Sequence, residues 1–122
     1  MNIQSMNRII IVIACFLLWP NYVAAHAKLV SSAPAANESV ETAPKSILLT
    51  FNKPVESAFS SIRVFDLDDN PVKSEKPAHQ GNNAKTLEAI LPPLSAGKYK
   101  VTWRIVATDG HKMKNEYFFS IK

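Results

Sequence analysis

The sequence is short of cysteine and methionine and lacks any hydrophobic run long enough to cross a membrane. Its one cysteine, Cys15, lies near the N-terminus. No disulfide can therefore form within the chain, and the fold must be held by its own hydrophobic core. The longest apolar run, residues 9–19, has eleven residues, which is too few for the roughly 30 Å of a bilayer core. The 14 Lys and Arg residues are scattered rather than clustered, which argues against a nucleic-acid partner.

Residues 1–25 have the pattern of a secretory signal peptide. Arg8 supplies a positive charge, the apolar run follows it, and Val23-Ala24-Ala25 places small residues where a signal peptidase cleaves. We therefore expect residues 1–25 to be removed. Residues 26–122 are then expected to form one exported domain that has no cysteine and no membrane span.

Apolar and polar residues alternate with a period of two through the rest of the chain. This alternation, with β-branched and aromatic residues and a turn about every 8–12 residues, predicts an all-β domain. About seven short strands favour a Greek-key β-sandwich or barrel of immunoglobulin type, with a helical turn in residues 55–59. The clearest expected strands are residues 47–51, 61–66, 86–91, 97–105 and 117–121.

Four aromatic side chains are expected in the core rather than on a ligand-binding surface. They lie on the inward side of the expected strands: Phe51, Trp103, Tyr117 and Phe119. Such side chains dominate core burial because of their large apolar area.

Three residues from opposite ends of the chain could together bind a metal ion. If the chain is cut after Ala25, His26 can offer its new α-amine and its Nδ1 to one metal, closing a six-membered chelate ring. Asp109 and His111 are two residues apart in the turn before the last strand, so they can project to the same side. They would add an oxygen and a third nitrogen. A planar set of three nitrogens and a carboxylate suits Cu(II), whereas zinc prefers tetrahedral sites and often thiolate.

Several short segments spread over residues 26–122 form a recognisable set. They are His26-Ala27, Ser32-Ala33-Pro34-Ala35 with Asn37, Leu49-Thr50-Phe51 with Pro54-Val55-Glu56, residues 97–104, and Ala107-Thr108-Asp109-Gly110-His111. Together they resemble the CopC family of periplasmic copper-binding proteins, including its YobA-like members. The resemblance implies a seven-stranded cupredoxin-like or immunoglobulin-like fold in the periplasm. It also implies a Cu(II) site formed by the amine and imidazole of His26 with Asp109 and His111.

The sequence departs from one feature of that family. Some members carry a methionine-rich loop that holds Cu(I), whereas the corresponding residues 68–85 contain no methionine. Met113 is the one methionine of the expected exported domain, and thioethers are the ligands that select Cu(I). We therefore expect one Cu(II) site and no separate Cu(I) site. His79 is expected on the surface of the polar loop 76–85, and whether His79 or Met113 contacts copper stays open.

These observations predict a periplasmic Cu(II)-binding protein of copper homeostasis and resistance, and not an enzyme. The protein would buffer copper or deliver it to a membrane copper transporter, and the resemblance implies an inner-membrane copper importer as the partner. We expect the exported domain to be a monomer.

Two other functions stay open. An N-terminal histidine with a second histidine also resembles the histidine brace of copper-dependent polysaccharide monooxygenases, which are redox enzymes. Against this hypothesis, Asp109 would occupy a coordination position and favour Cu(II) over Cu(I). The other alternative is a metal-free immunoglobulin-like interaction module, and the position of His26 at the predicted cleavage site argues against it.

Overall fold

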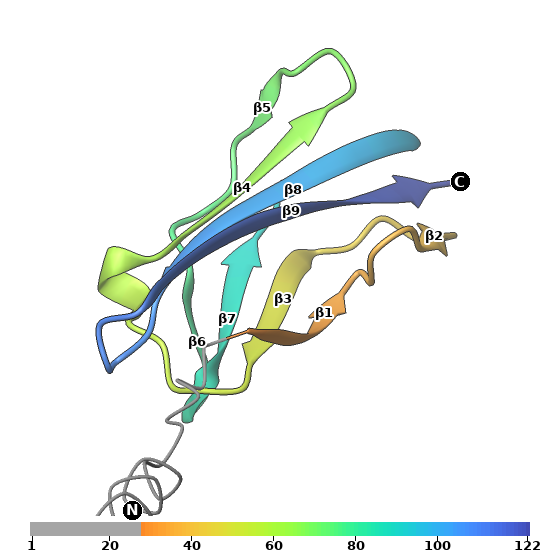
Figure 1. Cartoon of the computed structure of the whole chain (residues 1–122). Helices are drawn as coiled ribbons and strands as arrows, with labels where there is room; N and C mark the ends of the chain where they lie inside the picture. The colour runs from red at the N-terminus through yellow and green to blue at the C-terminus, as the bar shows by residue number, and fades with distance from the viewer. Residues whose placement is uncertain (1–27) are drawn as a thin grey trace, which may run out of the picture.

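Two β-sheets pack face to face in this protein (Figure 1). The computed structural model describes residues 28–122, so the predicted signal peptide and His26 lie outside the described residues. The strands are β1 (Leu29–Ala33), β2 (Ser39–Val40), β3 (Ser46–Phe51), β4 (Ser61–Asp66), β5 (Pro71–Val72), β6 (Ala78–Gln80), β7 (Asn83–Ile90), β8 (Gly97–Val106) and β9 (Lys112–Ile121). A short 3-10 helix, η1 (Ser57–Phe59), precedes β4. In this part of the chain no helix is long and apolar enough to span a membrane.

The long hairpin of β8 and β9 organises the larger sheet. One sheet has the strand order β1-β3-β7-β6, and the other has the order β2-β9-β8-β4-β5. β8 and β9 pair antiparallel without a break, from Gly97 opposite Ile121 to Val106 opposite Lys112. Because β8 is the central strand of its sheet, the loop that follows it is held at one end of the sandwich.

Alternating burial along the strands produces the core between the sheets. Along β8 every second residue is buried: Tyr99, Val101, Trp103 and Ile105. β3 alternates in the same way and contributes Ile47, Leu49 and Phe51. Phe51 and Trp103 meet edge to face with ring centroids 5.4 Å apart, a geometry that aromatic pairs favour. The prediction that four aromatic residues lie in the core is confirmed for Phe51, Trp103, Tyr117 and Phe119.

The predicted all-β sandwich is confirmed, although residues 28–122 form nine strands rather than about seven. The two-residue strands β2 and β5 are too short to show any alternation in the sequence. The last strand begins at Lys112 rather than near Tyr117, because the polar residues before Tyr117 also pair with β8. The helical turn expected in residues 55–59 is η1. The prediction of a polar loop at 76–85 is wrong, since β6 and the start of β7 lie there.

Candidate metal centre

Asp109 and His111 lie in the short loop that joins β8 to β9. The Gly110 N–H donates to the Ala107 carbonyl oxygen at 2.9 Å, and the Ala107 N–H donates to the His111 carbonyl oxygen at 2.8 Å. Gly110 has a φ of 89°, a left-handed conformation that residues with a Cβ rarely adopt. The glycine therefore lets the chain reverse between Asp109 and His111.

This loop is fixed to the segment that follows β3. The Thr108 N–H donates to the Pro54 carbonyl oxygen at 3.0 Å, and the Glu56 N–H donates to the last carbonyl of β8 at 2.8 Å. Between these two bonds, Val55 is buried and forms a β-bridge with Ala107. The buried side chains of Val55 and Ala107 fix this connection to the core, so the loop that carries Asp109 is supported by packed residues on one side.

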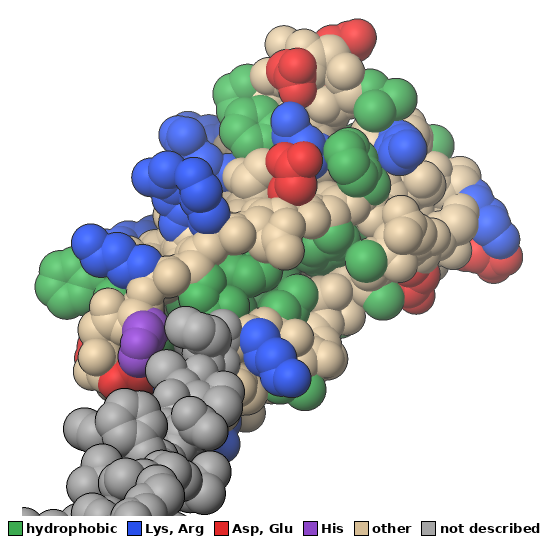
Figure 2. All heavy atoms as spheres, viewed as in Figure 1, with side chains coloured by type: hydrophobic (Ala, Val, Ile, Leu, Met, Phe, Trp, Pro, Cys, Tyr) green, Lys and Arg blue, Asp and Glu red, His purple; other side chains and the backbone are tan. Residues whose placement is uncertain are grey.

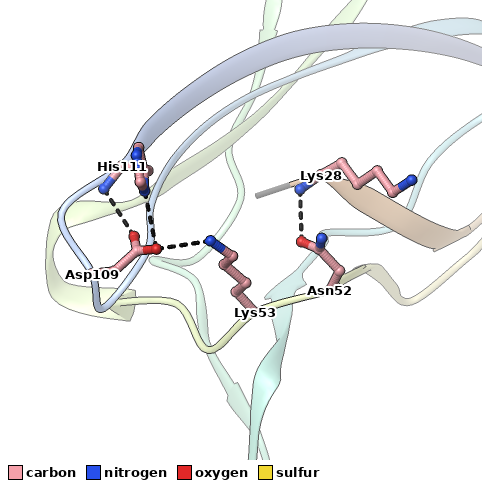
Figure 3. A network of polar contacts seen from close by, with 5 residues as sticks. All are labelled: Lys28, Asn52, Lys53, Asp109 and His111. Carbon is pink, nitrogen blue, oxygen red and sulfur yellow. Dashed lines mark hydrogen bonds and ion pairs between the residues drawn. The ribbon is translucent and has the colours of Figure 1, made fainter. Parts of the chain in front are cut away.

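The two predicted ligands of this loop are in direct contact (Figure 3). Asp109 Oδ2 lies 3.0 Å from His111 Nδ1. Asp109 Oδ1 accepts a hydrogen bond from the His111 backbone N–H, also at 3.0 Å. The two side chains remain 39% and 47% exposed, respectively. The structure thus brings both residues together at a place that solvent ions can reach.

The contact with Asp109 determines which nitrogen of His111 can ligate a metal. When Nδ1 carries the proton and donates it to the carboxylate, the lone pair of the neutral ring lies on Nε2. A carboxylate that accepts from a metal-binding histidine fixes the tautomer and the orientation of the ring. In this arrangement Asp109 orients His111; to offer an oxygen to the same ion, its carboxylate would have to turn away from Nδ1.

A lysine that the sequence analysis did not single out completes this cluster. Lys53 Nζ donates to Asp109 Oδ2 at 2.9 Å across 56 residues of sequence. Its side chain is only 26% exposed. A single lysine after a strand forms no sequence motif, so the role of Lys53 is visible only in the structure, where it contacts Asp109.

The carboxyl group of Asp109 is strongly held in its charged form. The hydrogen bond from the His111 side chain, then the His111 backbone N–H and then Lys53, lower the pKa of Asp109 far below its ordinary value. Asp109 is therefore an anion throughout the neutral pH range, and it can accept a cation without first losing a proton.

The start of the described chain is tied to the same end of the sandwich. The Lys28 N–H donates to Asn52 Oδ1 at 2.8 Å, and the Asn52 N–H donates to the Lys28 carbonyl oxygen at 3.1 Å. Asn52 directly precedes Lys53, and Figure 3 shows Lys53 reaching from this segment toward Asp109. His26, the third predicted ligand, precedes Lys28 by two residues and lies outside the described residues.

Within residues 28–122 no group of three or more His, Cys, Asp or Glu side chains could hold a metal ion. The described part of the chain therefore offers the pair Asp109 and His111 rather than a complete site. His79 lies in β6 rather than in a loop, and it is only partly exposed, since its Nε2 lies 2.7 Å from the Val55 carbonyl oxygen. Met113 packs against the core.

Comparison with known protein families and sequences identifies one family. The family model described as CopC domain matches residues 29–122. Protein YobA of Escherichia coli (strain K12) is 34% identical over 120 residues, which cover 98% of this chain and 96% of that protein. Copper transport protein CutJ of Bacillus subtilis (strain 168) is 32% identical over 117 residues, which cover 94% of this chain and 22% of CutJ.

Two solved structures share the fold. The crystal structure of CopC from Methylosinus trichosporium OB3b has a TM-score of 0.75 and 33% identity, and the match covers 80% of this chain and 94% of that one. PcoC from Escherichia coli, described as a methionine rich copper resistance protein, has a TM-score of 0.70 and 34% identity. That match covers 80% of this chain and all of PcoC, 100%.

Proposed function

The chain belongs to the CopC family, and from that premise we propose that it binds one Cu(II) ion through His26, Asp109 and His111. The observation that carries the proposal is the 3.0 Å contact between Asp109 Oδ2 and His111 Nδ1 at an exposed end of the sandwich. An imidazole nitrogen and a carboxylate oxygen without a thiolate suit Cu(II), which favours tetragonal nitrogen and oxygen sites.

Cleavage after Ala25 would supply the remaining ligands. His26 would then offer its α-amine and its Nδ1, which form a chelate on one metal. Lys28 is held by Asn52, and two extended residues reach at most about 7 Å from that point. The new N-terminus would therefore stay near the end of the sandwich that carries Asp109. We propose that residues 1–25 are a signal peptide and that the site exists only after export to the periplasm.

The proposed role is to hold copper, as a monomer, and to pass it to a membrane copper transporter, with an inner-membrane importer as the partner. A segment similar to this chain makes up 22% of the copper transport protein CutJ, which supports a place for the domain beside a transporter. We propose no separate Cu(I) site, because residues 68–85 contain no methionine and thioethers select Cu(I).

Catalysis is not part of the proposal. The charged carboxylate of Asp109 would favour Cu(II) over Cu(I), which slows the redox cycling that an oxidase or monooxygenase needs. Sustained hydrogen peroxide production by the copper-loaded protein with ascorbate would contradict this role.

Substituting His111 tests the site directly. His111→Gln should lower the Cu(II) affinity of the natively processed protein by more than about 100-fold, since even supporting residues of metal sites contribute about 10–100-fold. His79→Gln is the matched control, because glutamine can still donate to the Val55 carbonyl oxygen, and its affinity should stay within about threefold. A competition titration against a chelator of known affinity measures both. Equal losses in the two variants would disprove the proposed ligand.

A further inference from the structure

The outer side of the five-stranded sheet collects basic side chains. The buried residues of β4, β8 and β9 point into the core, so the residues between them point outward. Figure 2 shows Lys and Arg side chains gathered over this side of the molecule. Six of the 14 Lys and Arg residues of the chain lie on this surface, which we call the basic face: Arg63, Lys98, Lys100, Arg104, Lys112 and Lys114.

The strand register places like charges side by side on the basic face. Arg104 on β8 lies directly opposite Lys114 on β9. Like charges directly opposite each other destabilise a sheet. Among residues 28–122 neither side chain forms an ion pair that would offset this repulsion. The arrangement therefore points to an anion outside the protein.

The centre of the basic face is hollowed. The hollow has a volume of about 840 Å³ and is lined by four basic residues and one acidic residue, Glu116. One of the four, Lys100, is paired with Asp69 at 3.3 Å. The other three cations are exposed: Arg63, Arg104 and Lys114.

An exposed aromatic side chain borders the basic face near the candidate metal centre. Phe59 in η1 is 74% exposed, and it lines a second hollow with Arg104, Lys112 and Lys114. Amphipathic helices that lie in the headgroup region of a bilayer combine Lys and Arg with apolar side chains such as Phe, and the edge of the basic face has the same combination. Lys112 follows His111 directly, so the basic face and the candidate metal centre adjoin.

We propose that the basic face docks on an anionic phospholipid surface, with Phe59 at the headgroup boundary. Four of the six cations are lysines, and lysine is depleted at protein–protein interfaces. Near an anionic bilayer, in contrast, each Lys or Arg strengthens binding about fivefold. The composition therefore favours a lipid surface over an acidic protein. Docking in this way would hold Asp109 and His111 close to the membrane. The inference goes beyond the proposed copper binding and does not depend on it.

Co-sedimentation with vesicles tests the docking. The natively processed protein should bind vesicles of equal parts phosphatidylglycerol and phosphatidylcholine at low salt. It should bind vesicles of phosphatidylcholine alone far more weakly, and raising the salt to about 0.15 M should weaken the binding to anionic vesicles. The absence of binding to anionic vesicles at low salt would overturn the proposal and leave an acidic protein surface as the partner of the basic face.

A matched pair of triple variants locates the binding surface. Replacing Arg63, Arg104 and Lys114 by Gln should weaken binding to anionic vesicles at least tenfold. The control replaces three exposed lysines away from the basic face by Gln: Lys45, Lys76 and Lys85. The control has the same net charge and should lose less than about threefold. Equal losses would show attraction by net charge alone and would overturn the proposal.

Tryptophan fluorescence tests the orientation. Phe59→Trp should show a blue shift of its emission on addition of anionic vesicles, whereas Ile90→Trp, on the other sheet, should not. A blue shift for Ile90→Trp alone would show that the four-stranded sheet, and not the basic face, contacts the membrane, and it would overturn the proposal. Measuring the apo and the Cu(II)-loaded protein separately distinguishes a failure of docking from a failure of copper binding.

Discussion

Asp109 accepts hydrogen bonds from two directions. His111 donates to it with both its side chain and its backbone, and Lys53 donates to the same Oδ2 that faces the imidazole. A metal ion bound at Oδ2 would compete with the ammonium group for this oxygen and would be repelled by its charge. At the residue scale, Lys53 is therefore a positioning residue that also opposes metal binding.

Removing the lysine charge should strengthen copper binding. We expect Lys53→Met to raise the Cu(II) affinity by about two- to fivefold, because partly exposed ion pairs contribute about 0–1 kcal/mol. Lys45→Met, which removes an exposed lysine before β3, should leave the affinity unchanged. A competition titration measures both variants. A weaker affinity of Lys53→Met would mean that holding Asp109 in place outweighs the repulsion.

At the scale of single strands, alternation places neighbouring side chains in different environments. In β3, Leu49 is fully buried in the core, whereas Leu48 faces the other side and is partly exposed. Leu49→Ala should lower the free energy of unfolding by about 2–5 kcal/mol. Leu48→Ala, the same change one residue away, should cost less than about 1 kcal/mol. Chemical denaturation compares them, and similar losses would contradict the assigned register.

Strand β9 contains a buried tyrosine that should respond to alkaline pH. Burial, with a smaller effect of the Glu38 charge, raises the pKa of Tyr117 to about 12, and the neighbouring Ser32 only partly opposes this. Although Ser32 is near, the buried hydroxyl of Tyr117 forms no hydrogen bond of good geometry with any of residues 28–122. Because folding raises this pKa, the neutral phenol stabilises the fold below pH about 10, and that stability is lost as the pH rises toward about 12.

Replacing this tyrosine should therefore reduce the alkaline sensitivity. Tyr117→Phe should be at least as stable as the natural protein at pH 7, since it removes a buried unbonded hydroxyl. It should also lose less stability between pH about 10 and about 12. Tyr99→Phe is the matched control: the Tyr99 hydroxyl donates to the Ser95 carbonyl oxygen at 2.8 Å, so this variant should lose about 1 kcal/mol at pH 7. Thermal unfolding across this pH range would show whether the two variants differ.

At the scale of the whole molecule, the sandwich was predictable because long strands such as β3 and β8 keep a strict period of two. The contact between Asp109 and His111 was predictable because the two residues are close in sequence. The part played by Lys53 was not, because it depends on the end of β3 meeting the loop after β8. The contact of His79 with the Val55 carbonyl oxygen was not predictable either, since it also joins residues far apart in the sequence.

The basic face was predictable in part. Lys98, Lys100 and Arg104 alternate with buried residues along β8, and Lys112 and Lys114 share one side of β9, so the period of two already puts each group on one side of its strand. They form one surface because β4, β8 and β9 are neighbours in the sheet and their outward residues lie side by side. The pairing of β4 with β8, which no local pattern encodes, adds Arg63 to the five cations of the β8–β9 hairpin.

The central claim is that the two ends of the chain form one Cu(II) site after removal of residues 1–25. The most direct test is an electron paramagnetic resonance spectrum of the natively processed protein with one equivalent of Cu(II), compared with a form that retains a methionine before His26. We predict superhyperfine splitting from three nitrogen ligands in the processed protein. The extended form should lose at least one nitrogen and bind copper more than tenfold more weakly, as roughly expected when a chelating amine is removed. Identical spectra and affinities for the two forms would contradict the account.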